Sequence, residues 1–156
     1  MAQNKINILD LFAGIGGFSI SAKWAFGKRA NTIGFCEIDE HCCAVLTKRF
    51  PGVPIFGDVR DLNRRKINLP IDIVTGGFPC QDYSVATTLQ NSKGLIGKKG
   101  VLWWSIHKIL SEKKNPPKYL FLENVDRLLK SPSGQRGRDF AIMLKSLDDL
   151  GYAVEW

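Results

Sequence analysis

Short apolar runs of β-strand character alternate with helical patterns along this chain, and this alternation constrains the fold more than any other feature. It is typical of βαβ units that build a mostly parallel sheet. The expected strands are Ile6–Leu11, Thr32–Glu37, Pro54–Gly57, Ile71–Thr75 and Tyr119–Glu123. The expected helices are Phe18–Phe26, Asp39–Phe50, Val101–Glu112 and Gly137–Leu150, and a further strand-like run, Tyr152–Trp156, follows Gly151. The sequence therefore predicts an α/β fold that is cut off after about five strands.

The size of the chain bounds its organisation. A length of 156 residues with 44% hydrophobic content is enough for one domain with a core and too short for two typical domains. No apolar run is long enough to cross a bilayer, and Met1–Lys5 lacks the apolar segment of a secretory signal. We therefore expect residues 1–156 to form a single cytoplasmic domain.

Charge and thiol content narrow the classes of function. The formal charge is +7, which favours a polyanionic partner. The cysteines show no CxxC spacing; they are Cys36, Cys42, Cys43 and Cys80. This pattern suits neither a zinc site nor a disulfide framework, so we expect reduced thiols and no bound metal.

One thiol, Cys80, lies just beyond the end of an expected strand. Pro79 fixes its own φ and biases Phe78 toward extended geometry, so the backbone that enters the thiol is stiff. The preceding Gly76 and Gly77 leave room for a ligand to approach the main chain. A buried core cysteine is the alternative reading of a lone thiol in an apolar strand. The polar loop that follows the thiol favours a nucleophile instead.

A glycine-rich turn follows the first expected strand. Asp10–Gly17 closes that strand and opens a helix, where free backbone amides bind ligands in open α/β sheets. Ser19 stands where a dinucleotide fingerprint requires glycine, which argues against an ordinary nicotinamide site. Glu37, about twenty residues on, ends the second strand, where an acid can bind ribose hydroxyls, and Asp58 follows the third. Each acid has a helix-capping alternative, which we prefer for Asp39. The pattern predicts an adenosine ligand.

Another carboxylate, Glu123, ends the fifth expected strand. Because neighbouring parallel strands end at the same edge of a sheet, we expect Glu123 to face Cys80. A carboxyl group there can protonate a heterocycle nitrogen while the thiol attacks the ring. A capping or surface acid is the alternative. Asn124, the next residue, is expected to fix loop geometry through its side-chain amide.

Together these motifs resemble the cytosine-5 DNA methyltransferases of bacterial type. Phe12–Gly17 is similar to their S-adenosylmethionine loop, Phe78–Gln81 to their catalytic Pro-Cys motif, and Glu123–Val125 to their Glu-Asn-Val motif. The resemblance covers nearly the whole chain. It implies a Rossmann-like methyltransferase fold, S-adenosylmethionine as cofactor, and double-stranded DNA as partner.

The resemblance also implies roles for individual residues. The catalytic residues would be Cys80, Glu123, Pro79 and Asn124. The cofactor-binding residues would be Phe12, Ala13, Gly14, Ile15, Gly16, Gly17, Glu37, Ile38, Asp58 and Phe78. Among these, Glu37 would hold the ribose, and Ile38 and Asp58 the adenine. Cys80 would add to C6 of a flipped-out cytosine while Glu123 stabilises the protonated N3, and C5 would then accept the methyl group.

Members of that family continue with a motif rich in glutamine and arginine, a target-recognition region and a final helix, and none of these precedes Trp156. We therefore expect the catalytic portion of a restriction-modification enzyme that needs a C-terminal part or a complementing subunit. Two alternatives stay open. The chain could be a non-catalytic cofactor-binding or assembly module of a split methyltransferase, or it could methylate cytosine in RNA.

Overall fold

The computed structural model describes residues 4–62, 67–78, 102–111, 115–130 and 135–156. These residues belong to two compact units. The first contains residues 1–77 and 113–122, and the second contains residues 78–112 and 123–156. Within the described ranges, no helix has the length and apolar character that crossing a membrane requires.

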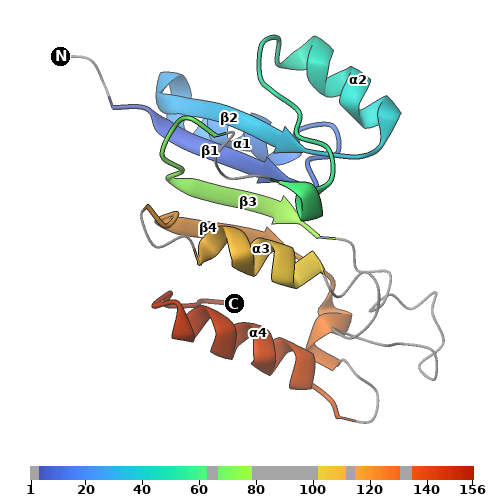
Figure 1. The fold of residues 1–156 in the computed structure, drawn as a ribbon, viewed down its shortest axis with the longest axis vertical. Coiled ribbons are helices and arrows are strands. Elements are labelled where there is room, and N and C mark those ends of the chain that lie inside the picture. The colour runs from blue at the N-terminus through green and yellow to red at the C-terminus, as the bar shows by residue number, and fades with distance from the viewer. Residues whose placement is uncertain (1–3, 63–66, 79–101, 112–114, 131–134) are drawn as a thin grey trace. The chain divides into compact units, whose positions relative to one another are not determined.

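A four-stranded sheet organises the first unit. Its strands are β1 (Ile6–Leu11), β2 (Ala30–Cys36), β3 (Ile73–Gly77) and β4 (Tyr119–Glu123), in the order β2-β1-β3-β4 (Figure 1). The central strand β1 pairs in parallel with both β2 and β3. Five of its six residues are buried, as expected for a strand covered on both faces. The predicted mostly parallel α/β architecture is confirmed.

Four α-helices lie close to where the sequence predicts them. They are α1 (Gly17–Phe26), α2 (Glu40–Arg49), α3 (Leu102–Leu110) and α4 (Arg138–Asp149). The described residues also form the short 3₁₀ helices η1 (Gly27–Arg29), η2 (Val59–Asp61) and η6 (Asp126–Lys130). The preference for Asp39 as a helix cap is confirmed, because its Oδ1 accepts from the Cys42 amide at 2.9 Å. The predicted bounds Val101 and Glu112 of the third helix lie outside the described residues.

Two predicted strands are wrong. Residues 54–57 contribute only an isolated bridge between Ile55 and Phe35, because Pro54 has no amide to donate and Gly57 turns the chain at a φ of 72°. Residues 152–156 have no strand structure. The Tyr152 amide instead donates to the Leu147 carbonyl at 3.0 Å and closes the end of α4. The described sheet therefore has four strands, where the sequence suggests about five.

The third strand of the sheet begins and ends two residues later than predicted. Gly76 and Gly77 belong to β3, and a β-carbon at Gly76 would lie 2.8 Å from the Leu11 carbonyl oxygen. Glycine at position 76 therefore allows β3 to approach β1 closely. The interpretation that Gly76 leaves room for a ligand is wrong, because the neighbouring strand occupies that space.

Each unit has its own core. In the first, Ala13, Phe35, Leu46 and Phe50 form a buried cluster between the turn after β1, β2 and α2. In the second, fully buried Trp103 of α3 donates its indole N–H to Ser146 Oγ of α4 at 3.2 Å. That hydrogen bond satisfies the polar end of a large core side chain, as buried tryptophans require.

Candidate active site

The turn between β1 and α1 contains three residues with positive φ, and one of them is not glycine. Phe12 adopts a φ of +51°, and Gly14 and Gly16 adopt +53° and +86°. The Ala13 amide donates to the Cys36 carbonyl at 3.1 Å, and the Gly16 amide donates to the Ala13 carbonyl at 2.8 Å. A non-glycine residue in the left-handed region is strained, and such strain gathers at ligand sites.

The two glycines of this turn differ in their surroundings. A β-carbon at Gly14 would meet no atom within 4 Å, whereas one at Gly16 would lie 2.5 Å from the Phe50 ring. The turn is therefore open at Gly14 and packed against the core at Gly16. Ile15, between them, is 52% exposed. The main chain at Gly14 therefore has open space beside it.

The carboxylate of Glu37 holds this turn from the end of β2. Its Oε2 accepts from the Gly14 amide at 2.7 Å, and its Oε1 accepts from the Ile38 and Asp39 amides at 2.8 and 2.9 Å. The predicted proximity of Glu37 to the glycine turn is thus a direct hydrogen bond. A carboxylate has roughly four acceptor sites, so Glu37 retains capacity for a ligand hydroxyl. Ile38 beside it is 71% exposed and offers an apolar surface.

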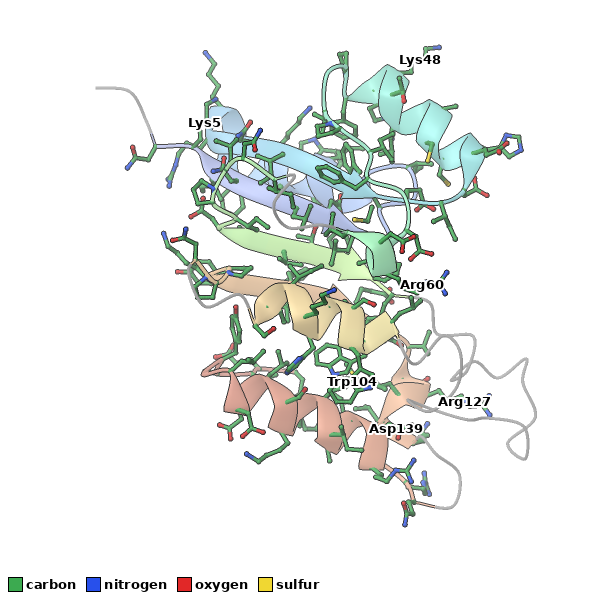
Figure 2. The ribbon with its side chains drawn as sticks, in the orientation of Figure 1. Lys5, Lys48, Arg60, Trp104, Arg127 and Asp139 are labelled. Atoms are coloured by element: carbon green, nitrogen blue, oxygen red, sulfur yellow. The ribbon has the colours of Figure 1, made fainter. Side chains whose placement is uncertain are left out.

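Asp58 lies at the N-terminus of η2 and not at the end of a strand. Its side chain accepts from the Arg60 amide at 2.8 Å and pairs with the Arg60 guanidinium, 2.5 Å away, which is labelled in Figure 2. The side-chain hydrogen bond from Arg60 is the main reason that the pKa of Asp58 is lowered. The capping alternative therefore describes Asp58 in this structure, and its role toward adenine stays a prediction.

Three carboxylates lie near enough to the buried Cys36 thiol to influence its pKa. Burial raises the pKa of the Cys36 thiol to about 12, and the charges of Asp58, Asp10 and Glu37 add to the effect in that order. Sequence reasoning expected Glu37 and Asp58 at one sheet edge with the glycine turn. Glu37 contacts the turn directly, whereas Asp58 is connected to this region only through its effect on Cys36, as is a third acid, Asp10.

That third acid, Asp10, is fully buried. Its Oδ2 accepts from the Ser19 hydroxyl at 2.7 Å and its Oδ1 accepts from the Thr75 hydroxyl at 2.8 Å. Burial raises the pKa of Asp10, and the two hydroxyl donors oppose the shift. The sequence feature that could have pointed to this acid is an aspartate within the otherwise apolar end of the strand Ile6–Leu11. The hydrogen bond to Asp10 also explains why serine suits position 19, because a glycine there would have no hydroxyl to donate.

In the second unit, the side chain of Asn124 contacts the segment that leads to the predicted nucleophile. Its amide donates to the Phe78 carbonyl at 3.2 Å, and its Oδ1 accepts from the Val125 amide at 2.9 Å. The Phe78 ring lies 6.3 Å from that of Trp103. Asn124 was expected to fix loop geometry through its side-chain amide, and that amide binds the main chain at Phe78.

The predicted catalytic residues Pro79 and Cys80 lie outside the described residues, so the expected approach of Glu123 to Cys80 stays a prediction. Glu123 ends β4 and is exposed. Gly17, another predicted cofactor contact, is the first residue of α1 and is also exposed.

An open, mostly parallel α/β sheet with a glycine-rich turn between its first strand and first helix defines a Rossmann-like fold. The chain belongs to the C-5 cytosine-specific DNA methylase family, whose sequence model matches residues 6–156. It is 45% identical over 167 residues to the type II methyltransferase M.Sau3AI of Staphylococcus aureus, covering 99% of this chain. It is 35% identical over 164 residues to the type II methyltransferase M.AluI of Cellulosimicrobium cellulans, covering 98% of this chain.

Solved structures share the fold. The methyltransferase EhMeth of Entamoeba histolytica superimposes with a TM-score of 0.74 at 18% identity, covering 98% of this chain and 46% of that one. The S. pombe Dnmt2 methyltransferase gives a TM-score of 0.65 at 17% identity, covering 90% and 42%. The chain spans only 39% of M.Sau3AI and 28% of M.AluI.

Proposed function

We propose that this chain carries the cofactor turn and the catalytic residues of an enzyme that methylates C5 of cytosine in double-stranded DNA. The observation that carries the proposal is the family match over residues 6–156, which includes all three predicted motifs. The excess of basic residues, +7 in formal charge, agrees with a polyanionic substrate.

The first unit fits S-adenosylmethionine as cofactor. Gly14 leaves open space beside a backbone in the left-handed region, and Glu37 directs a carboxylate at the same turn. In this proposal Phe12 to Gly17 and Phe78 contact the cofactor, Glu37 binds its ribose hydroxyls, and Ile38 and Asp58 contact its adenine. When bound, S-adenosylmethionine supplies an electrophilic methyl group.

The chemistry on the base falls to residues of the second unit. The target cytosine leaves the duplex stack, because its ring atoms are inaccessible within it. The Cys80 thiolate adds to C6 while Glu123 stabilises the protonated N3, and C5 becomes nucleophilic. After C5 has gained its methyl group, it loses its proton, the C6–S bond breaks, and Cys80 leaves as a thiolate. Pro79 stiffens the backbone before the thiol, and Asn124 anchors the Phe78 carbonyl.

We further propose that turnover requires more polypeptide than this chain, either continuous with it or as a complementing subunit. The support is that the chain spans 39% of M.Sau3AI. The same observation favours a second candidate function, in which the chain only binds the cofactor or assists assembly of a split methyltransferase.

Transfer of tritiated methyl from S-adenosylmethionine to duplex DNA tests the proposal. The assay uses this chain alone and mixed with a completing segment, defined as the part of M.Sau3AI that the chain does not match. We expect transfer in the mixture, located at C5 of cytosine by nucleoside analysis.

The control is Cys80→Ala in the same mixture, with single-stranded RNA as a parallel substrate. Transfer to DNA that persists in Cys80→Ala would refute the proposed mechanism. Cofactor binding without transfer by any mixture would favour the non-catalytic module, and transfer to RNA alone would overturn the assignment of DNA as substrate.

A further inference from the structure

The buried carboxylate of Asp10, in the strand that leads into the glycine turn, has no role in the proposed chemistry. Asp10 has no exposed surface, and both of its oxygens accept hydrogen bonds from hydroxyls, Ser19 at 2.7 Å and Thr75 at 2.8 Å. Its strand neighbours Leu9 and Leu11 are apolar and equally buried. Three consecutive residues of β1 are thus inaccessible, and only the middle one is polar.

A carboxylate in such a place is costly. Burial penalises the charged form of an acid, and hydrogen bonds only partly offset the lost hydration. Apolar residues of matching shape could replace the acid and its two partners with little loss of stability. The polar group therefore needs an explanation beyond core packing.

The positions of the two partners of Asp10 explain why a polar group is present here. Asp10 precedes the turn and Ser19, in the first part of α1, follows it, so their hydrogen bond closes the loop across its base. Thr75 lies opposite Asp10 in the pairing of β1 with β3. One carboxylate thus joins the strand before the turn, the helix after it and the adjacent strand. The Gly14 amide, held by Glu37 at 2.7 Å, lies within the loop so closed.

We propose that Asp10 is a positioning residue of the cofactor turn, which it holds in the binding conformation through Ser19 and Thr75. This inference rests on the proposed function, since it assumes that the turn binds S-adenosylmethionine. Asp10 itself does not contact the ligand. It fixes the two ends of the turn so that Gly14 and Glu37 keep their geometry before the cofactor arrives, which lowers the ordering cost of binding.

Calorimetric titration of the whole chain with S-adenosylmethionine tests this role, and the chain offers a matched control. Asn7 lies near the other end of β1, is 8% exposed, and also makes two side-chain hydrogen bonds, to the Pro70 carbonyl and from Asn31. Asp10→Ala and Asn7→Ala therefore each remove a buried polar group with two partners from the same strand. Only the first removes a hydrogen bond that joins the two sides of the turn.

We expect Asp10→Ala to weaken cofactor binding by about tenfold or more, because two buried hydroxyls lose their acceptor. Asn7→Ala is expected to change binding by less than about twofold, despite a comparable loss of stability. Asp10→Asn should remain within about threefold of the parent, because hydroxyls can rotate to accept as well as donate. Ser19→Ala should weaken binding in the parent and add little to Asp10→Ala, since both remove the hydrogen bond between Asp10 and Ser19.

Folded Asp10→Ala that binds the cofactor as tightly as Asn7→Ala would overturn the inference. If Asp10→Ala does not fold, the comparison of Ser19→Ala with Asn7→Ala decides in the same way. A folded parent that binds no cofactor would instead reject the cofactor part of the proposed function.

If the parent chain binds no cofactor, amide hydrogen exchange still tests the positioning role of Asp10, because it needs no ligand. Faster exchange at Gly14 and Gly16 in Ser19→Ala, but not in Asn7→Ala, supports the positioning role, and equal exchange in the two variants overturns it.

Discussion

Replacing Gly16 with alanine tests how tightly the glycine turn is packed against the core of the first unit. The new β-carbon would lie 2.5 Å from Phe50 Cε2 and 3.1 Å from Leu46 Cδ2. Both side chains are buried, with exposed fractions of 4% and 0%, so neither can move into solvent. Gly16 also has a φ of +86°, which disfavours any residue with a β-carbon.

The cost has two parts. The left-handed backbone costs an alanine about 1–2 kcal/mol, and forcing an extra carbon into a packed core costs about 1–3 kcal/mol. We expect Gly16→Ala to lower the free energy of unfolding by roughly 2–5 kcal/mol. For a chain of this size the Tm would fall by roughly 4–20 °C.

The turn contains its own control. Gly14 also has a positive φ, +53°, but an added β-carbon there would meet nothing within 4 Å. Gly14→Ala should therefore cost only the backbone part, about 1–2 kcal/mol. Urea unfolding of the two variants measures the difference. A double-mutant cycle with Phe50→Leu identifies its cause, because a smaller side chain at position 50 relieves the clash. Equal losses in Gly14→Ala and Gly16→Ala, or strict additivity of Gly16→Ala with Phe50→Leu, would refute the reasoning.

Three further predictions concern named groups. Burial raises the pKa of Asp10 above 3.8, so the folded chain holds this proton more tightly than the unfolded chain does, and the parent loses stability as pH rises above about 4. Asp10→Asn has no such proton, so its stability relative to the parent should increase as pH rises above about 4; a difference in urea unfolding that is constant with pH contradicts this. Asn124→Ala removes the hydrogen bond to the Phe78 carbonyl and should slow methyl transfer by about 10- to 100-fold, with a smaller loss of cofactor affinity because Phe78 is also a proposed cofactor contact; a loss of affinity as large as the loss of rate would contradict a role of Asn124 beyond cofactor binding. Cys36, with a pKa raised to about 12 by burial and nearby carboxylates, should react with iodoacetamide at pH 8 more slowly than the less buried Cys42; equal labelling by mass spectrometry would be inconsistent with its burial.

The parts of the fold that the sequence predicts well have strong local signals. The bounds of β1 and β4 match the prediction because each run has clear strand character and a distinct end. Residues 54–57 look similar in sequence, yet Pro54 and Gly57 prevent a ladder, and only one bridge forms. Strand formation also needs a partner in space, which no local pattern supplies. The run Tyr152–Trp156 has strand-like composition and no strand structure for that reason.

The candidate site divides in the same way. The glycine turn and Glu37 could be predicted because a strand-end acid and a Gly-rich turn follow a known spatial rule, and their contact is a 2.7 Å hydrogen bond. The hydrogen bonds of Asp10 could not be predicted from the sequence, because its partners Ser19 and Thr75 lie 9 and 65 residues away. Long-range hydroxyl contacts leave no periodicity in the sequence. Asp58 caps η2 and pairs with Arg60 in the structure, and its expected contact with adenine stays a prediction.

The central claim is that the Cys80 thiol bonds to the cytosine ring. The most direct measurement incubates the chain and its completing segment with S-adenosylmethionine and duplex DNA in which 5-fluorocytosine replaces cytosine. Fluorine at C5 cannot leave as a proton does, so the addition product should persist as a covalent protein–DNA complex. The account predicts such a complex, with the methylated base mapped by mass spectrometry to the peptide that contains Cys80, and none with Cys80→Ala. A complex that maps to another residue, or that forms equally in Cys80→Ala, would contradict it.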